Sequence, residues 1–311
     1  MSAGIKPKKN AIVHGVLLLD KPKGLSSNGI LGKVKWLFGT KKAGHTGTLD
    51  PMATGLLPIC FGEATKFSTD LLEADKAYDA ELKLGVTTTT GDAEGDVIEQ
   101  RAVVVTQKAL DAALSQLRGK IIQVPPMYSA LKRDGRPLYE YARAGIELER
   151  EGREVIIHDL QCTGWHGEVV KLSVTCSKGT YIRVLAEDLG KLLGCGAHLT
   201  ALRRTQVGRL SVIESVTAQS LEEMDMAQRL QYLQPVDALL TALPVVKLDV
   251  DLAKRFLNGQ RLPLGEELVQ QLTQGHAARV RVYDDVQRLL GTAQLAVYGV
   301  LSPERLIAAS N

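Results

Sequence analysis

The chain has 311 residues, more than a single hydrophobic core normally supports, so a large domain with a smaller second one is expected. Hydrophobic residues make up 45% and charged residues 23%, which excludes a disordered or fibrous protein. The net charge of +3 is too small to identify a nucleic-acid partner by itself. No stretch has the length of a membrane span or of a signal peptide, so the expected location is the cytoplasm.

Apolar spacing predicts the elements of the first half of the chain. Residues 1–14 are expected to form a flexible basic arm. Ser26 or Ser27 is placed to cap a helix, because Ile30, Leu31, Val34 and Leu37 follow at helical spacing. The other expected elements are a buried strand at 15–20, a strand at 55–61, a helix at 63–72 and a half-buried strand at 78–84.

The second half mixes strands and helices without regular alternation. A helix is predicted at 106–117, strands at 154–176, a helix at 184–193 and extended chain at 201–213. This order favours an α+β fold on a central mixed, largely antiparallel sheet. The pattern resets between Pro235 and Pro244. We therefore expect a catalytic domain over 15–248 and a small C-terminal unit over 249–311, the latter with one helix at 252–258 and several short strands.

The loop G-T-K-K-A-G-H-T-G-T-L-D-P-M-A-T-G at 39–55 is the first candidate for chemistry. Its glycines have phosphate-loop spacing, but His45 replaces the lysine that would reach the phosphates, which counts against a nucleotide-dependent enzyme. What remains is Asp50, held among glycines and threonines. A carboxylate fixed in this way can serve as nucleophile, general base or metal ligand. The plainer alternative is that Asp50-Pro51 only starts a turn.

The whole string resembles the catalytic-aspartate motif of the TruB-type tRNA pseudouridine synthases. The resemblance is strong over residues 15–215 and rests on further segments, which are G-V-L-L-L-D-K-P-K-G-L-S-S at 15–27, G-E-A-T-K-F at 62–67, K-A-Y at 76–78, L-G-V-T-T-T-T-G-D-A-E-G at 84–95, V-P-P-M-Y-S-A-L-K at 124–132, S-K-G-T-Y-I-R at 177–183 and A-H-L-T-A-L-R-R at 197–204.

The resemblance implies an isomerase with the pseudouridine-synthase α+β fold and a small C-terminal β-rich domain similar to PUA domains. It implies that uridine 55 in the T-loop of tRNA is flipped out, cleaved from its sugar and rejoined through carbon, without a cofactor. The four cysteines lack metal-ligand spacing, and no metal site is expected either. The T-arm of tRNA is the expected partner of a stand-alone, monomeric enzyme with no obligate protein partner.

The resemblance also assigns the catalytic residues. Asp50 is the essential carboxylate, and two roles remain open: attack on the sugar C1′, or removal of a 2′ proton. Arg183 is its cationic partner, and a buried arginine can bind a carboxylate bidentately and hold its orientation. Tyr78 is expected to stack on the uracil and is a candidate for the later proton transfer at C5. Tyr181 would share a face with Arg183 if the segment is still extended there.

The remaining expected substrate contacts have supporting roles. His45 is expected to fill the space left by the flipped base, and Leu202 to line the uridine pocket through its backbone. Lys21 and Lys66 are expected either to contact phosphate or to support the loop.

Two further segments are expected to bind RNA. Basic and aromatic residues interleave in the insertion at about 124–150, namely Lys132, Arg133, Arg136, Tyr139, Tyr141 and Arg143. In the C-terminal unit, Lys254, Arg255 and Arg261 could contact the acceptor stem, although a purely stabilising domain is the alternative. Two rival functions remain: an RNA-binding or folding protein without turnover, and an enzyme of the same fold that acts on another RNA.

Overall fold

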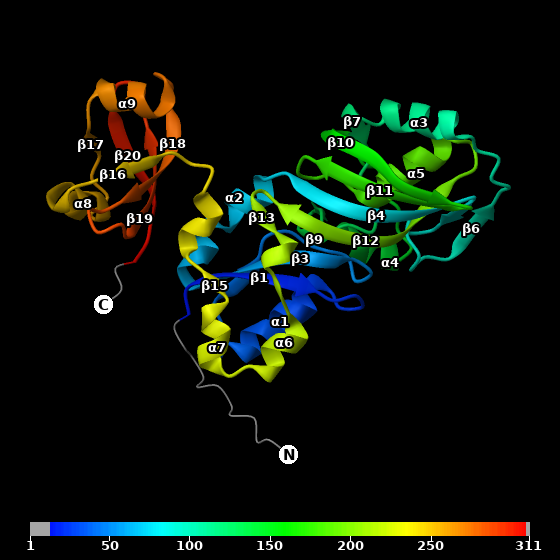
Figure 1. Ribbon diagram of the computed structural model, residues 1–311, viewed down its shortest axis with the longest axis horizontal. Helices are drawn as coiled ribbons and strands as arrows, with labels where there is room; N and C mark the ends of the chain where they lie inside the picture. Colours follow the sequence, from blue (N-terminus) through cyan, green and yellow to red (C-terminus); the bar gives the residue numbers. More distant parts are fainter. Residues whose placement is uncertain (1–12, 309–311) are drawn as a thin grey trace, which may run out of the picture.

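The computed structural model describes residues 13–308. Figure 1 shows a large unit and a small C-terminal unit, the latter drawn in orange and red. The arm expected at 1–14 lies almost wholly outside the described residues. None of the helices between residues 13 and 308 is long and apolar enough to span a membrane.

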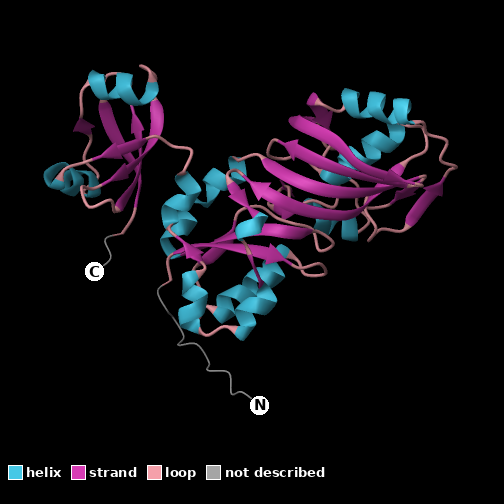
Figure 2. Ribbon diagram, viewed as in Figure 1, coloured by secondary structure: helices cyan, strands magenta, loops and turns pink. Residues whose placement is uncertain are grey.

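The large unit is built on an 11-stranded sheet, drawn in magenta in Figure 2. Two neighbouring pairs are parallel, β1 with β14 and β3 with β12, and the others are antiparallel. The mixed, largely antiparallel sheet predicted from the sequence is therefore confirmed. The main path runs β14 (Val216–Thr217), β1 (Gly15–Lys21), β3 (Thr54–Phe61), β12 (Ala197–Val207), β4 (Lys76–Leu84), β11 (Val169–Cys176), β10 (Arg153–His166) and β7 (Gly119–Gln123), with β2 (Ala43–His45), β13 (Leu210–Ser211) and β15 (Leu233–Gln234) beside it.

Short helices and hairpins surround this sheet. The helices are α1 (Ser27–Leu37), η1 (Gly62–Phe67), α2 (Ser68–Glu73), α3 (Gln107–Gln116), α4 (Leu138–Arg143), α5 (Ile182–Leu192), η2 (Val212–Glu214), α6 (Ala218–Glu223), α7 (Met226–Gln231) and η3 (Val236–Leu240). Two small hairpins complete the unit, β5 (Val86–Thr88) with β6 (Val97–Gln100) and β8 (Lys132–Arg133) with β9 (Arg136–Pro137).

Local sequence explains why the elements near the loop 39–55 form. The Gly29 N–H donates to the Ser26 hydroxyl oxygen at 3.0 Å, which makes Ser26 the N-cap of α1. The apolar side of α1 packs in the same hydrophobic cluster as residues of α3, α5 and the sheet. In β4 alternate residues from Lys76 to Leu84 are buried, so Tyr78 faces inward as the period of two predicts.

The small unit has its own sheet and core. Its five strands are β16 (Val245–Lys247), β18 (Ala278–Tyr283), β19 (Leu289–Leu295), β20 (Val300–Leu306) and β17 (Leu262–Pro263), in that order. The sheet begins at Val245, ahead of the boundary expected at 249. Two helices, α8 (Val250–Leu257) and α9 (Glu266–Thr273), pack on it, whereas the sequence predicted one. The sequence gives little sign of α9 because Gly265 before it supplies no capping side chain.

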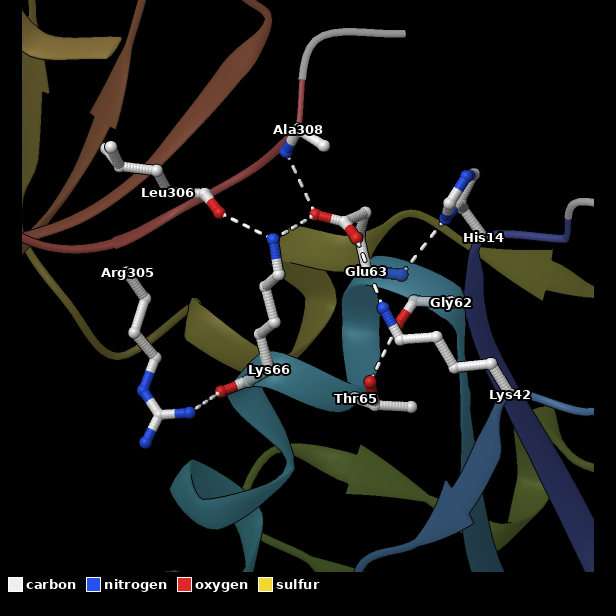
Figure 3. Close-up of polar contacts among 9 residues, drawn as sticks. All are labelled: His14, Lys42, Gly62, Glu63, Thr65, Lys66, Arg305, Leu306 and Ala308. Carbon is white, nitrogen blue, oxygen red and sulfur yellow. Dashed lines mark hydrogen bonds and ion pairs between the residues drawn. The ribbon is translucent and has the colours of Figure 1, made fainter. Parts of the chain in front are cut away.

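Hydrogen bonds between charged side chains and backbone groups fasten the small unit to the large one, as Figure 3 shows. The Lys66 ammonium donates to the Leu306 carbonyl at 2.8 Å and pairs with Glu63 at 2.6 Å. The Ala308 N–H donates to the same Glu63 carboxylate at 2.9 Å. The ion pair of Asp70 with Arg279 adds a direct ionic contact between the units, joining α2 to β18.

Glu63 should make this contact sensitive to acid. Its burial raises the pKa, but bonds from Lys66, Ala308 and Lys42 prevail and lower it from 4.5 to about 2. A carboxyl with a lowered folded-state pKa stabilises the protein above its unfolded value and loses that contribution as pH falls through the folded value.

We therefore predict that Glu63→Gln lowers the free energy of unfolding at neutral pH. The difference from wild type should shrink as pH falls from 4.5 towards 2, measured by denaturant unfolding wherever both proteins remain folded. Glu73→Gln, which breaks an exposed ion pair with Lys178, is the control and should change little. A Glu63→Gln deficit that does not vary with pH would contradict this account.

Candidate active site

The loop carrying Asp50 is held in place by the elements on either side of it. The Leu49 N–H donates to the Ser27 hydroxyl oxygen at 2.8 Å, and that hydroxyl donates to the Leu49 carbonyl at 2.9 Å. The Ala53 N–H donates to the Asp50 carbonyl at 3.1 Å. Asp50-Pro51 therefore does start a turn.

Lys21 supports the loop by binding its backbone carbonyls. Its side chain is completely buried, and its ammonium donates to the Ala53 carbonyl at 2.6 Å and the Pro22 carbonyl at 2.9 Å. Burial lowers the pKa of Lys21 to about 8, with Asp50 acting against that shift. Of the two roles expected for Lys21, the structure places it for loop support, with no surface open to a phosphate.

Asp50 is paired with a buried arginine. The Nε atom of Arg183 lies 3.0 Å from Asp50 Oδ2, and only 6% of the Arg183 side chain is exposed. The other two nitrogens donate to backbone carbonyls, Nη1 to Thr90 at 3.1 Å and Nη2 to Tyr128 at 2.8 Å. The bidentate pair that an arginine can form with a carboxylate is absent here, because these two carbonyls take up Nη1 and Nη2 of the guanidinium.

A second carboxylate, that of Asp92, also lies beside Arg183, and the sequence does not indicate this contact. Its Oδ2 atom lies 3.6 Å from Arg183 Nε, and its side chain is 5% exposed. A backbone bridge from Asp92 to Leu199 brings its loop beside β12. The stretch G-D-A-E-G was noted only as part of the resemblance, since sequence spacing does not show that residues 50, 92 and 183 meet.

Burial dominates the ionisation of Asp50. Burial raises its pKa above the ordinary value, Arg183 lowers it, and the like charge of Asp92 raises it again. Arg183 therefore limits the rise of the Asp50 pKa without reversing it. Asp50 therefore remains a stronger base than an exposed aspartate.

A cavity of about 260 Å³ opens beside Asp50 and collects most of the expected site residues. It is lined by Tyr78 from β4, Leu202 from β12, and both Tyr181 and Arg183. A second cavity of about 530 Å³ shares Asp50 and Arg183 and extends to Tyr139 and Arg143 of the insertion. Asp50 thus lies where a narrow pocket meets a wider groove.

Tyr181 and Arg183 reach the pocket in an unexpected way. Tyr181 is the N-cap residue of α5, with an extended backbone, and the helix begins at Ile182. The condition for a shared face, extended chain as far as Arg183, is therefore not met. Both side chains still line the pocket, because the first turn of α5 lies at its wall.

His45 and Lys66 lie outside the lining of both cavities. His45 sits in β2, paired with Ile59 of β3, and its buried Nδ1 atom has no hydrogen-bond partner among the described residues. Burial, with a smaller effect of Arg204, lowers the pKa of His45, so its ring is neutral at physiological pH. Lys66 is engaged with the small unit and does not meet the residues around Asp50.

Comparison with known proteins identifies the class that this fold and pocket define. Residues 35–182 match the TruB family pseudouridylate synthase (N terminal domain). Residues 183–241 match the tRNA pseudouridylate synthase B C-terminal domain, and residues 244–307 match Pseudouridine synthase II TruB, C-terminal. The protein is a pseudouridine synthase, an isomerase, as the sequence predicted.

Individual relatives narrow the family. The chain is 61% identical to tRNA pseudouridine synthase B of Burkholderia mallei (strain NCTC 10247) over 95% of this chain and 97% of that protein. It is 55% identical to the protein of that name from Cupriavidus metallidurans over 95% of this chain and 94% of the relative. The chain therefore belongs to the TruB family of tRNA pseudouridine synthases.

Solved structures agree on the fold. A Cbf5-Nop10-Gar1 complex contains a chain that matches with a TM-score of 0.72 at 24% identity, covering 97% of this chain and 89% of that one. A structure of an H/ACA RNP bound to a substrate RNA containing 2′-deoxyuridine matches with a TM-score of 0.71 at 23% identity, covering 95% and 85%. At these identities the likeness shows the pseudouridine synthase fold alone.

The contact between Asp92 and Arg183 leads to a prediction about pH dependence. If Asp50 acts as a carboxylate, activity falls as pH falls through its raised pKa. Asp92→Asn removes a like charge, so the acid limb of the single-turnover rate should move to lower pH. Asp96→Asn, at an exposed position of the same loop, should leave the limb unchanged. An acid limb that stays in place or moves to higher pH in Asp92→Asn would refute the repulsion between Asp92 and Asp50.

Proposed function

We propose that this enzyme converts uridine 55 in the T-loop of tRNA to pseudouridine, with Asp50 as its nucleophile. The observation that carries the proposal is the Asp50 carboxylate, held at 3.0 Å by buried Arg183 at the mouth of a pocket walled by two tyrosines. The relatives named tRNA pseudouridine synthase B support tRNA as the substrate.

The pocket suits a base removed from its stack. A flipped uracil loses its stacked neighbours and gains an aromatic face from Tyr78, with Tyr181 and Leu202 closing the walls. Asp50 then acts at the sugar, by attack on C1′ or by removal of a 2′ proton. The freed base turns and rejoins the sugar through C5, and Tyr78 takes the C5 proton. No cofactor or metal takes part in this scheme.

The insertion is proposed to bind nucleotides next to the flipped uridine. The Arg136 guanidinium carbon lies 5.0 Å from the centre of the Tyr141 ring, and that of Arg143 lies 5.4 Å from the Tyr139 ring. Tyr139 and Arg143 line the wider groove beside Asp50, where cations can bind phosphates and rings can stack on bases.

The small unit is proposed to bind the acceptor stem through Lys254, Arg255 and Arg261, whose side chains are all exposed. His45 remains proposed as a contact to the displaced nucleotides, since its neutral ring lies at the base of the catalytic loop. We expect the enzyme to act as a monomer, in the cytoplasm and without an obligate protein partner.

Pseudouridine mapping tests the reaction and its nucleophile together. Unmodified tRNA is incubated with wild type or Asp50→Asn, and pseudouridine is located by carbodiimide-blocked primer extension. We expect a T-loop stop that depends on Asp50, with the rate reduced by at least about 10³-fold in the variant while tRNA still binds. Substantial turnover by Asp50→Asn would remove Asp50 as nucleophile, and a stop elsewhere in RNA would point to another substrate.

Arg183→Lys tests the contacts of the guanidinium. One ammonium cannot reach Asp50 and the Thr90 and Tyr128 carbonyls at once, since these lie on different sides of the planar group. The single-turnover rate should fall by about 10²-fold, with tRNA affinity changed far less. Lys191→Arg, at an exposed position of α5, serves as the matched exchange and should retain the rate. Wild-type turnover by Arg183→Lys would show that charge alone suffices.

A further inference from the structure

A second buried arginine lines the pocket. Arg204 is 1% exposed and lies directly opposite Tyr78 in the antiparallel pair of β12 and β4. Its Nε atom donates to the Leu56 carbonyl at 2.8 Å and its Nη2 atom to the Gly47 carbonyl at 3.1 Å. Arg204 and Tyr78 both line the 260 Å³ cavity that Asp50 borders.

Arg204 differs from Arg183 in its charge balance. Between residues 13 and 308, no carboxylate lies within ion-pair distance of Arg204. A buried guanidinium without a counter-ion is costly, and carbonyl dipoles offset only part of that cost. The ionisable group directly across the strand pair is the Tyr78 phenol, which would supply the missing negative charge if it ionised.

Other charged groups around Tyr78 are few. Lys76 precedes it by two residues on the same buried face of β4, and Cys176 of β11 pairs with Lys76. Asp50 borders the cavity. Burial raises the pKa of Tyr78, and the Arg204 charge acts against that rise, while Cys176 and Asp50 add to it. Arg204 is thus the main influence that favours a negative oxygen on Tyr78.

The last step of the isomerisation requires such an oxygen. After the base rejoins the sugar, C5 carries both the C1′ bond and its original hydrogen, and N1 is doubly bonded to C6. The C5 proton passes to a phenolate, and the C–H electron pair forms the C5–C6 double bond. The electron pair released from the C6–N1 bond takes a proton from water at N1, so atoms and charge balance.

We propose that Arg204 is a positioning residue for this step, holding the Tyr78 oxygen in the place and charge state in which it accepts the C5 proton. The inference rests on the proposed function of Tyr78 and adds the residue that enables it. It also explains why an arginine without a counter-ion is kept inside the catalytic pocket. A role confined to bracing Leu56 and Gly47 would not depend on which atom is bonded to C5.

Two tRNA substrates separate proton removal from the earlier steps. With uridine tritiated at C5, tritium release reports loss of the C5 hydrogen. With 5-fluorouridine, cleavage and rejoining can occur but no C5 proton can leave. In single turnovers Arg204→Gln should slow tritium release by about 10²-fold and slow the rearrangement of 5-fluorouridine by less than about 3-fold. Equal slowing with both substrates would overturn the proposal.

Matched variants show whether charge is the cause. Arg204→Lys should recover part of the tritium-release rate, because it keeps a cation at the wall. Arg203→Gln removes the neighbouring cation, which pairs with Asp20 at 2.7 Å, and should release tritium at the wild-type rate. A loss in Arg203→Gln as large as in Arg204→Gln would overturn the assignment.

Carbon-13 labelling at the tyrosine ζ carbon gives a readout independent of turnover, with the Tyr78 signal identified by its absence in Tyr78→Phe. Tyr78 should ionise at higher pH in Arg204→Gln than in wild type, and in Arg204→Lys if the glutamine variant does not fold. An unchanged ionisation would overturn the proposal.

Tyr78→Phe distinguishes a failure of the role proposed for Tyr78 from a failure of the role proposed for Arg204. If it releases tritium at the wild-type rate, the proposed function of Tyr78 fails and the role of Arg204 fails with it. If Tyr78→Phe is slow while Arg204→Gln is not, only the role of Arg204 fails.

Discussion

The buried guanidinium of Arg183 is the contact on which the active site depends. A cation removed from water must have its donors satisfied, and here a carboxylate and two carbonyls from separate segments do so. Asp50 comes from the loop before β3, Thr90 from the turn after β5, and Tyr128 from the insertion. Any motion of the insertion near Tyr128 therefore acts on the guanidinium that holds the Asp50 carboxylate, so the proposed RNA-binding segment and the proposed nucleophile share one contact residue.

Burial is the common cause of the unusual ionisation in this pocket. It raises the pKa of Asp50 and of Tyr78, and in each case one arginine opposes the rise. The two arginines differ in the groups around the guanidinium. Arg183 has two carboxylates beside it, Asp50 and Asp92, whereas Arg204 has backbone carbonyls and the Tyr78 phenol. In the proposed scheme, the carboxylate that acts first has an ion-pair partner, whereas the phenol that acts last faces an arginine that is otherwise bound only to backbone carbonyls.

The sequence predicted most of the sheet because burial on one face imposes a period of two, as in β4, where Tyr78 faces inward. It predicted the residues around Asp50 by resemblance, since spacing alone favoured a plain turn at Asp50-Pro51. It could not predict that Asp92 lies beside Arg183, or that two Arg183 nitrogens bind carbonyls and leave one for Asp50. Both depend on which segments the fold brings to the guanidinium. Helix α9 lacked a capping signal, and tertiary packing against the small sheet decides that it forms.

The net charge of +3 also failed to indicate an RNA partner, and the structure explains why. Several cationic side chains form ion pairs within the protein. Lys66 pairs with Glu63 and Arg279 with Asp70, both at the contact between the two units. The motif residue Lys66 therefore orients the small unit, a role that a substrate-based interpretation of the motif overlooks. The charges that remain available for phosphates are those on exposed surfaces, such as Arg261. Because many acidic side chains pair with cations inside the fold, they do not cancel the charge of exposed cations nearby. The net charge of the chain therefore understates the local positive potential at such surfaces.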